Sequence, residues 1–161
     1  MGSGFKSRGV YLDAAAEIVG EAGGIGRLLL DAQRTYSAAA LAEFRSRGYG
    51  GLTLSHANLI AQLGVDGAQV GELADRAGVT KQAATSLVKD LESRGFVQRA
   101  ADPEDRRAIW VTPTDTGWAF KRDAAVIEQA IETRWAVALG EAGIVQLRDL
   151  LRRAIDPTSS T

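Results

Sequence analysis

Two groups of polar side chains in the middle of the chain stand out by their type and spacing. The first group combines lysines, a glutamine and small hydroxyl residues: Thr80, Lys81, Gln82, Thr85, Ser86 and Lys89. The second is the stretch RAADPEDRRAIWVT at residues 99–112, in which two apolar-rich runs flank three acids and two arginines. Lysine and arginine bind phosphate oxygens, and glutamine can pair with the edge of an adenine. If the fold exposes both groups, they have the chemistry of a nucleic-acid contact.

The chain offers little material for other chemistry. It has one histidine, His56, and no cysteine, which excludes disulfides, thiolate metal sites and cysteine redox sensing. Ser55 precedes His56, but adjacent residues on a helix do not face each other, so they are not a nucleophile and its base. A single histidine does not make a metal site. We therefore expect no enzyme, no metal and no cofactor, and the plainest role for His56 is that of a polar helix residue.

The composition suits one globular domain with an added helical layer. The chain has 161 residues, of which 45% are hydrophobic and 24% charged, and its net charge is −1. Global charge therefore does not indicate a nucleic-acid partner, and any such contact depends on local placement. No apolar run approaches the roughly 20 residues that span a bilayer, and no signal peptide is recognised. We expect a cytoplasmic protein without a membrane partner.

Hydrophobic spacing predicts two short helices joined by a tight turn. Apolar residues at i, i+3, i+4 and i+7 run from Val70 to Ala77, and the same spacing runs from Ala84 to Leu91. A turn with a glycine lies between them, and Thr80 can cap the second helix, at about residues 80–94. Two amphipathic helices in this arrangement form a helix-turn-helix. With the apolar side chains in the core, the first polar group faces outward.

The remaining elements complete a mainly α (α+β) fold. Residues 96–100 and 108–112 predict two strands with the charged tip between them. Further helices are expected at 25–47, 54–63, 114–139 and 142–155, with Gly140 as a break. A helix-turn-helix followed at once by a hairpin is a winged helix. Apolar stripes on the first and last long helices are wider than this lobe needs, which indicates a partner subunit.

The chain is therefore expected to contain five segments. These are an N-terminal extension with a short helix (1–24), a first dimerisation helix (25–52), a winged helix-turn-helix lobe (53–113), C-terminal dimerisation helices (114–156) and a flexible tail (157–161).

The sequence from Gly71 to Gly117 resembles the DNA-binding lobe of the MarR family of bacterial transcriptional regulators. The most specific match is D-x-R at the hairpin tip, Asp105-Arg106-Arg107, followed by a strand and T-x-x-G at residues 114–117. The match departs at Pro113, where the family usually has another apolar residue, and we expect this proline to shorten the second strand. Trp110 also replaces a smaller residue there, and we expect it to pack under the wing, with a contact to DNA or an effector as the alternative.

The resemblance implies a homodimeric repressor that binds double-stranded DNA at a pseudo-palindromic operator. Helix 80–94 would enter the major groove, and Arg107 would enter the adjacent minor groove. A neighbouring carboxylate can orient a guanidinium, so we expect Asp105 to hold Arg107 while Arg106 reaches a phosphate. Small effectors of the family tend to bind where the first long helices meet the winged lobe. His56 lies near that place and is a candidate ligand-binding residue.

An alternative function remains open at this point. Some winged helices bind proteins and make no specific DNA contact, and the recognition face discriminates between the two classes. Acids or bulky apolar residues on that face would favour a protein partner, whereas this sequence has Lys81, Gln82, Thr85, Ser86 and Lys89 there. From Ala68 to Thr112 the lobe nevertheless has seven basic and seven acidic residues, so its charge is balanced.

Overall fold

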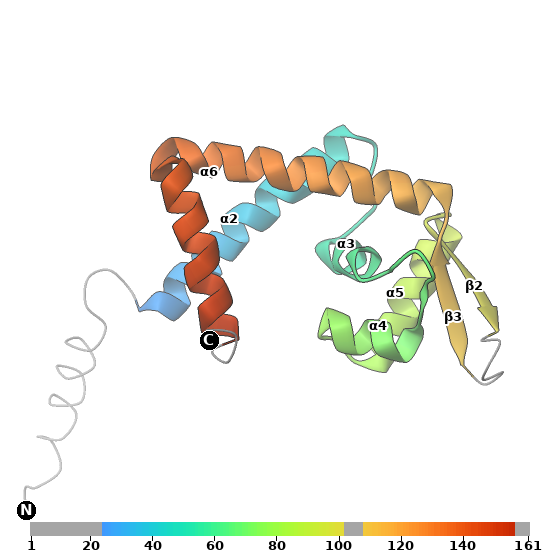
Figure 1. The fold of residues 1–161 in the computed structure, drawn as a ribbon. Helices are drawn as coiled ribbons and strands as arrows, with labels where there is room; N and C mark the ends of the chain where they lie inside the picture. Colours follow the sequence, from blue (N-terminus) through green and yellow to red (C-terminus); the bar gives the residue numbers. More distant parts are fainter. Residues whose placement is uncertain (1–23, 102–107, 157–161) are drawn as a thin grey trace, which may run out of the picture. The chain divides into compact units, whose positions relative to one another are not determined.

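The computed structural model describes residues 24–101 and 108–156. The described elements are α2 (Ile25–Ser46), α3 (Leu54–Ala61), β1 (Ala68–Gln69), α4 (Val70–Ala77), α5 (Lys81–Ser93), β2 (Val97–Ala101), β3 (Ile109–Pro113) and α6 (Asp115–Ile155) (Figure 1). The predicted helix before residue 24, the tip of the hairpin and the tail at 157–161 lie outside the described residues. The fold is mainly helical with a small antiparallel sheet, as the sequence predicted.

The chain divides into two units, Met1–Ala38 and Ala39–Thr161, and the boundary falls inside α2. In the first unit, the described part of α2 is stabilised by pairs one turn apart, such as Arg27 Nε donating to Asp31 at 3.0 Å. Its apolar side chains Ile25, Leu28, Leu29 and Leu30 are exposed in the single chain. No described helix is long and apolar enough to cross a membrane.

The core of the second unit lies where α3, α4, α5 and the sheet meet the first half of α6. Its fully buried side chains are Leu59, Ile60, Leu63, Leu73, Val88, Leu91, Val97, Val111, Phe120, Ile127 and Ile131. Aromatic rings extend this core toward the loop after α2, with Tyr49 edge-on to Phe120 at a centroid distance of 5.0 Å. The spacing of apolar residues along α4 and α5 is thus confirmed as the buried side of both helices.

The helix-turn-helix has the predicted caps. Gly78 follows α4 in the left-handed region, with φ of 68°, where a residue with a Cβ would be strained. Thr80 caps α5, and its hydroxyl oxygen accepts a hydrogen bond from the Ala83 N–H at 3.2 Å. After α5, Gly95 has φ of 77°, and the Phe96 N–H donates to the Leu91 carbonyl at 2.9 Å. This Schellman ending turns the chain directly into β2.

The sheet differs from the predicted hairpin in two respects. It has three strands in the order β1-β3-β2, because the short β1 pairs with β3 through Ala68 and Val111. Two residues are too few to show a strand pattern, so the sequence gives no indication of β1. The expectation that Pro113 shortens β3 is wrong: Pro113 is the last residue of β3, lies opposite Val97 and is buried. A proline is tolerated there because the pairing ends with it.

Helix α6 begins by packing closely on the wing. Thr114 caps the helix by accepting from the Gly117 N–H at 3.2 Å, and its hydroxyl donates to the Gly95 carbonyl at 2.6 Å. A Cβ at Gly117 would overlap the carbonyl oxygen of Phe96, so only glycine allows this approach. Further along, Gly140 has φ of 74° and ψ of 159°, which interrupts the helix as predicted.

Candidate nucleic-acid interface

The outward face of α5 carries the polar group that the sequence singled out. Lys81, Gln82, Ser86 and Lys89 are exposed on this helix, and Thr85 is half-buried. On the opposite side, Ala84, Val88 and Leu91 are buried in the core. The structure therefore brings most of the predicted residues together on one helix face. Ala83 is also exposed there, and sequence reasoning missed it because its apolar side chain was not counted as a contact.

Two hydroxyl groups on this face also have structural partners. The Thr80 oxygen accepts the capping hydrogen bond from Ala83, and the Thr85 hydroxyl donates to the Lys81 carbonyl at 2.7 Å. Both hydroxyl oxygens keep acceptor capacity, since a hydroxyl has two lone pairs. The donors that face solvent are therefore the side chains of Lys81, Gln82, Ser86 and Lys89 and the hydroxyl of Thr80.

Ion pairs within the lobe determine which positively charged side chains are available to contact a partner. Arginines pair with acids on their own or a neighbouring element: Arg76 with Glu72 at 3.3 Å, Arg94 with Asp90 at 3.0 Å and Arg99 with Glu92 at 2.7 Å. Among the described residues, Lys81 and Lys89 have no ion-pair partner. The balanced charge of the lobe therefore leaves two unneutralised lysines on the exposed face of α5.

The wing is held to the C-terminal end of α5. Arg99 on β2 donates to Glu92 on α5, and this hydrogen bond holds the pKa of the Glu92 carboxyl below its usual value. Asp90 and Glu92 are half-buried and accept hydrogen bonds from side chains. Asp105, Arg106 and Arg107 at the wing tip lie outside the described residues.

Trp110 connects β3 to the loop before β1. Its indole N–H donates to the Asp66 carbonyl at 2.8 Å, and a Cβ at Gly67 would overlap the neighbouring backbone. Gly67 has φ of 83°, so glycine is favoured there on both counts. Next to this contact, a small hollow between α5 and β3 is lined by Gln69, Val70, Gly71, Lys81, Thr85, Ala108 and Ile109. Trp110 thus supports the base of the wing, as its predicted packing role requires.

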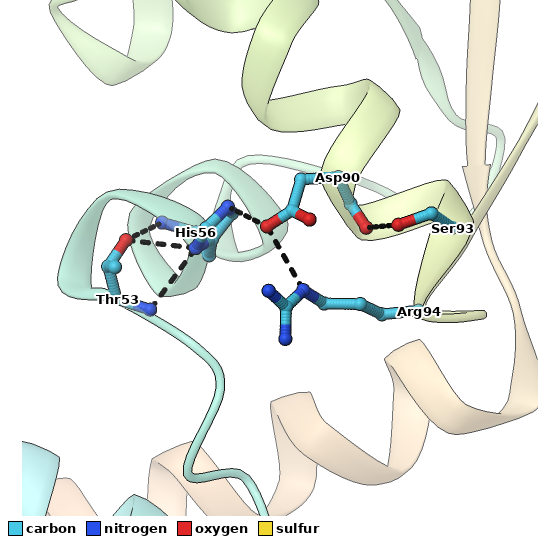
Figure 2. A network of polar contacts seen from close by, with 5 residues as sticks. All are labelled: Thr53, His56, Asp90, Ser93 and Arg94. Carbon is cyan, nitrogen blue, oxygen red and sulfur yellow. Dashed lines mark hydrogen bonds and ion pairs between the residues drawn. The ribbon is translucent and has the colours of Figure 1, made fainter.

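His56 lies inside the lobe, which the sequence did not predict. Its side chain is 7% exposed and hydrogen-bonds to Thr53 on one side and to Asp90 of α5 on the other, at 3.0 Å (Figure 2). Burial lowers the pKa of His56, and the nearby Asp90 carboxylate opposes that effect. The hollow between α3 and α6 is lined instead by Ala57, Ala61, Phe120, Lys121, Ala124, Ala125 and Glu128.

The chain is similar in sequence to known transcriptional regulators. Residues 50–108 match the sequence model described as the MarR family. A segment of 56 residues is 38% identical to the uncharacterized HTH-type transcriptional regulator YwhA of Bacillus subtilis (strain 168), and it covers 35% of this chain and 36% of that protein. The match thus spans about a third of the length of this curated relative.

Solved structures extend the similarity to most of the chain. A MarR-family transcriptional regulator from Rhodococcus sp. RHA1 has a TM-score of 0.71 at 25% identity, over 83% of this chain and 94% of that one. CouR from Rhodococcus jostii RHA1 bound to p-coumaroyl-CoA has a TM-score of 0.68 at 26% identity, over 84% and 94%. A transcriptional repressor CouR bound to a 23-mer DNA duplex has a TM-score of 0.72 at 24% identity, over 81% and 92%, and shows the fold alone. The segment at residues 50–108 thus matches the MarR family in sequence, and the fold of the chain is that of solved MarR-family winged helix-turn-helix regulators.

Proposed function

We propose that this protein is a sequence-specific DNA-binding repressor that binds a pseudo-palindromic operator as a homodimer. The observation that carries the proposal is the outward face of α5. It presents two lysines without ion-pair partners among the described residues, together with Gln82 and Ser86. The acids of the same helix, Asp90 and Glu92, are engaged by His56, Arg94 and Arg99. A face of this kind attracts phosphates and offers hydrogen bonds to base edges.

In this proposal the parts of the lobe have different roles. Lys81 and Lys89 contact phosphates, Gln82 pairs with a base edge, and the hydroxyls of Thr80, Thr85 and Ser86 contact bases or phosphates. Ala83 can contact a thymine methyl group, as small apolar side chains do in the major groove. At the wing tip, Asp105 orients Arg107 into the minor groove and Arg106 reaches a phosphate.

The second copy needed for a two-fold operator is supported by the long helices. Val137, Leu139, Val145, Leu150 and Ile155 of α6 are exposed in the single chain. Large apolar side chains that a chain leaves exposed in number are typical of an interface. A two-fold dimer of this kind places its recognition helices about one helical turn apart, at ~34–36 Å.

An effector is proposed to relieve repression by favouring one spacing of the two lobes. Support comes from the solved relative with p-coumaroyl-CoA bound, and from the hollow of about 170 Å³ between α3 and α6. Lys121 lines this hollow, and its ammonium donates to the carbonyls at the end of α3. Burial lowers the pKa of Lys121. His56 is occupied by Thr53 and Asp90, so this hollow is the better candidate site.

The first experiment is selection of bound duplexes from a random-sequence pool, followed by titration of the best duplex at several salt concentrations. We expect a pseudo-palindromic sequence bound by one dimer, with affinity that falls steeply as salt rises. A double variant, Lys81→Ala with Lys89→Ala, should bind weakly and show a shallower salt dependence. Arg152→Ala, which removes an exposed arginine near the end of α6, is the matched control and should bind like the wild type.

Two results would favour the alternative, a winged-helix module that binds a protein. One is that no sequence is enriched and binding stays weak at low salt. The other is that the Arg152→Ala control loses as much affinity as the double lysine variant, because the binding would then be a general charge effect. Either result removes the exposed face of α5 as the DNA contact.

A further inference from the structure

The single histidine of the chain joins two helices of the winged lobe. Figure 2 shows His56 on α3 between the backbone of Thr53 and the carboxylate of Asp90 on α5. The Thr53 N–H donates to His56 Nδ1 at 3.1 Å, and the His56 N–H donates to the Thr53 hydroxyl oxygen at 3.3 Å. The pair is thus a capping box in which histidine takes the place usually held by glutamate or glutamine. Its other ring nitrogen, Nε2, lies 3.0 Å from Asp90 Oδ2.

These contacts select one form of the imidazole ring. A nitrogen that accepts a hydrogen bond from a backbone N–H has a free lone pair, so Nδ1 is unprotonated. The proton then lies on Nε2 and is donated to Asp90. Glutamate in this place would accept from Thr53 but would repel Asp90. Neutral imidazole with its proton on Nε2 serves both partners at once.

Other charged groups around His56 come from the same helix as Asp90. Arg94, the C-cap residue of α5, donates to Asp90 at 3.0 Å, and its guanidinium lies where a Cβ at Gly51 would be. From α4, the neighbouring contact is the Ala77 carbonyl, which accepts from Asn58 at 3.1 Å. From α6, Lys121 reaches the opposite end of α3 at Ala61 and Leu63. Asp90 and Arg94 are therefore the charged groups that act on His56.

We propose that neutral His56 is a positioning residue for the DNA-contacting helix, which it holds against α3 through Asp90. The inference rests on the DNA-binding function proposed above. Asp90 follows Lys89 directly and lies one turn beyond Ser86, so a contact at Asp90 sets the rotation of the exposed face around the axis of α5. Without His56, Asp90 keeps only Arg94, which belongs to its own helix end and cannot hold α5 to α3.

The form of the ring makes the positioning dependent on pH. A second proton would go to Nδ1, which could then no longer accept from the Thr53 N–H and would instead donate to the Thr53 hydroxyl oxygen, 2.9 Å away. Protonation therefore breaks the hydrogen bond from the Thr53 N–H to the ring and loosens the start of α3, while the Nε2–H contact to Asp90 remains. Burial lowers the pKa of His56, so the ring is neutral in the folded lobe at pH 7.5. The arrangement is lost only when the pH falls below the pKa of an ordinary histidine.

Glutamine at position 56 is the variant that separates these effects. Its amide oxygen can accept from Thr53 and its amide nitrogen can donate to Asp90, but it has no proton to gain in this range. Affinity for the selected operator is measured between pH 7.5 and pH 5.5 for the wild type, His56→Gln and His56→Ala. Asn58→Ala is the matched control, because it removes a hydrogen bond from α3 to the end of α4 and leaves the contact to α5 intact.

We expect His56→Gln to bind like the wild type at pH 7.5 and His56→Ala to bind about tenfold more weakly. On acidification, the wild type should lose about tenfold more affinity than His56→Gln does. The ring itself is observable, since His56 is the only histidine: in tag-free protein labelled with ¹⁵N-histidine, Nε2 should carry the proton at pH 7.5. Amide signals of α5 should shift with the same midpoint.

Several outcomes overturn the inference. The inference fails if the wild type and His56→Gln bind equally at every pH, if Nδ1 carries the proton, or if Asn58→Ala binds as weakly as His56→Ala. A wild type that binds no enriched duplex overturns the proposed function, and the DNA-positioning role with it. A bound duplex with coincident pH profiles overturns this inference alone, so the two failures are distinguishable.

Discussion

At the scale of single residues, the acids of the lobe decide which positive charges act on a partner. Glu72, Asp90 and Glu92 each take an arginine or histidine partner. Ion pairs at the protein surface, such as Arg76 with Glu72, add little stability, at about 0–1 kcal/mol each. Their larger consequence is that they neutralise Arg76, Arg94 and Arg99, which leaves Lys81 and Lys89 as the unpaired positive charges of α5 among the described residues.

Gln82 and Lys89 provide a contrast between base reading and phosphate binding. We expect Gln82→Ala to weaken the binding free energy for the operator by about 1–3 kcal/mol, because an amide is lost from a base edge. Specificity at that one base pair should relax. Lys89→Ala should weaken binding to all sequences alike and reduce the salt slope by about 1. Titrations against the operator and its single-base variants, at several salt concentrations, measure both. If Gln82→Ala weakens all duplexes equally, Gln82 does not read a base.

The wing tip makes a second prediction at this scale, from residues outside the described structure. Arg107→Ala should weaken operator binding most where A·T pairs flank the half-sites, since a narrow minor groove attracts a guanidinium. Asp105→Asn should weaken it less, because Arg107 remains but is no longer held by a charged partner. Binding measured at one fixed salt concentration checks this order. An unchanged dissociation constant for Arg107→Ala would remove its proposed role.

At the scale of elements, the turn after α5 joins the recognition helix, the wing and α6. The Thr114 hydroxyl donates to the Gly95 carbonyl, and the Thr114 N–H donates to the Phe96 carbonyl at 3.0 Å. Gly117 allows the start of α6 to approach that same carbonyl of Phe96. The T-x-x-G motif that carried the resemblance thus has a physical role: it holds the start of α6 to the end of α5.

Two glycine substitutions test this close approach. Gly117→Ala should lower the free energy of unfolding by about 2 kcal/mol, because the added methyl group overlaps the backbone of Phe96. Gly71→Ala, in α4 with open space around its Cα, should raise it by about 0.5–1 kcal/mol through helix propensity. Urea unfolding followed by circular dichroism measures both. Equal stability of the two variants would show that α6 does not pack on Phe96 as described.

At the scale of the whole molecule, the apolar residues left exposed on α6 indicate a partner surface. Val137 is 88% exposed and Ile155 is 82% exposed in the single chain. Scattered exposed apolar residues are normal, but a series along one helix is costly unless something covers it. A second copy of the chain is the proposed cover.

A glutamate at position 137 tests the dimer. We expect Val137→Glu to sediment as a monomer and to lose at least about 100-fold in operator affinity, since a monomer holds one half-site only. Val65→Glu is the matched control, because Val65 is 78% exposed in the loop after α3. Analytical ultracentrifugation and operator titration measure the two effects. The proposed interface is wrong if Val137→Glu remains a dimer, or if Val65→Glu dissociates equally.

Much of the fold was predictable because its determinants are local. The apolar spacing of α4 and α5, the Thr80 cap and the glycines at 78 and 95 act within a few residues of themselves, so the helix-turn-helix follows from the sequence. The outward face of α5 was predictable for the same reason, because the side of a helix that is buried leaves the other side exposed. The strand pair of the wing was also placed within about one residue at each end.

What only the tertiary structure decided depends on residues that are far apart in the chain. The strand β1 exists because β3 lies beside it, and β3 ends at Pro113 because its partner Val97 is the first residue of β2. Asp90 is half-buried because α3 brings His56 to it. No local pattern contains that information, since hydrogen bonds and ion pairs between elements form only after the elements pack. The sequence by itself thus determined which face of α5 is exposed, and that face carries the proposed DNA contacts. Packing decided which charges remain outward and how α5 is held.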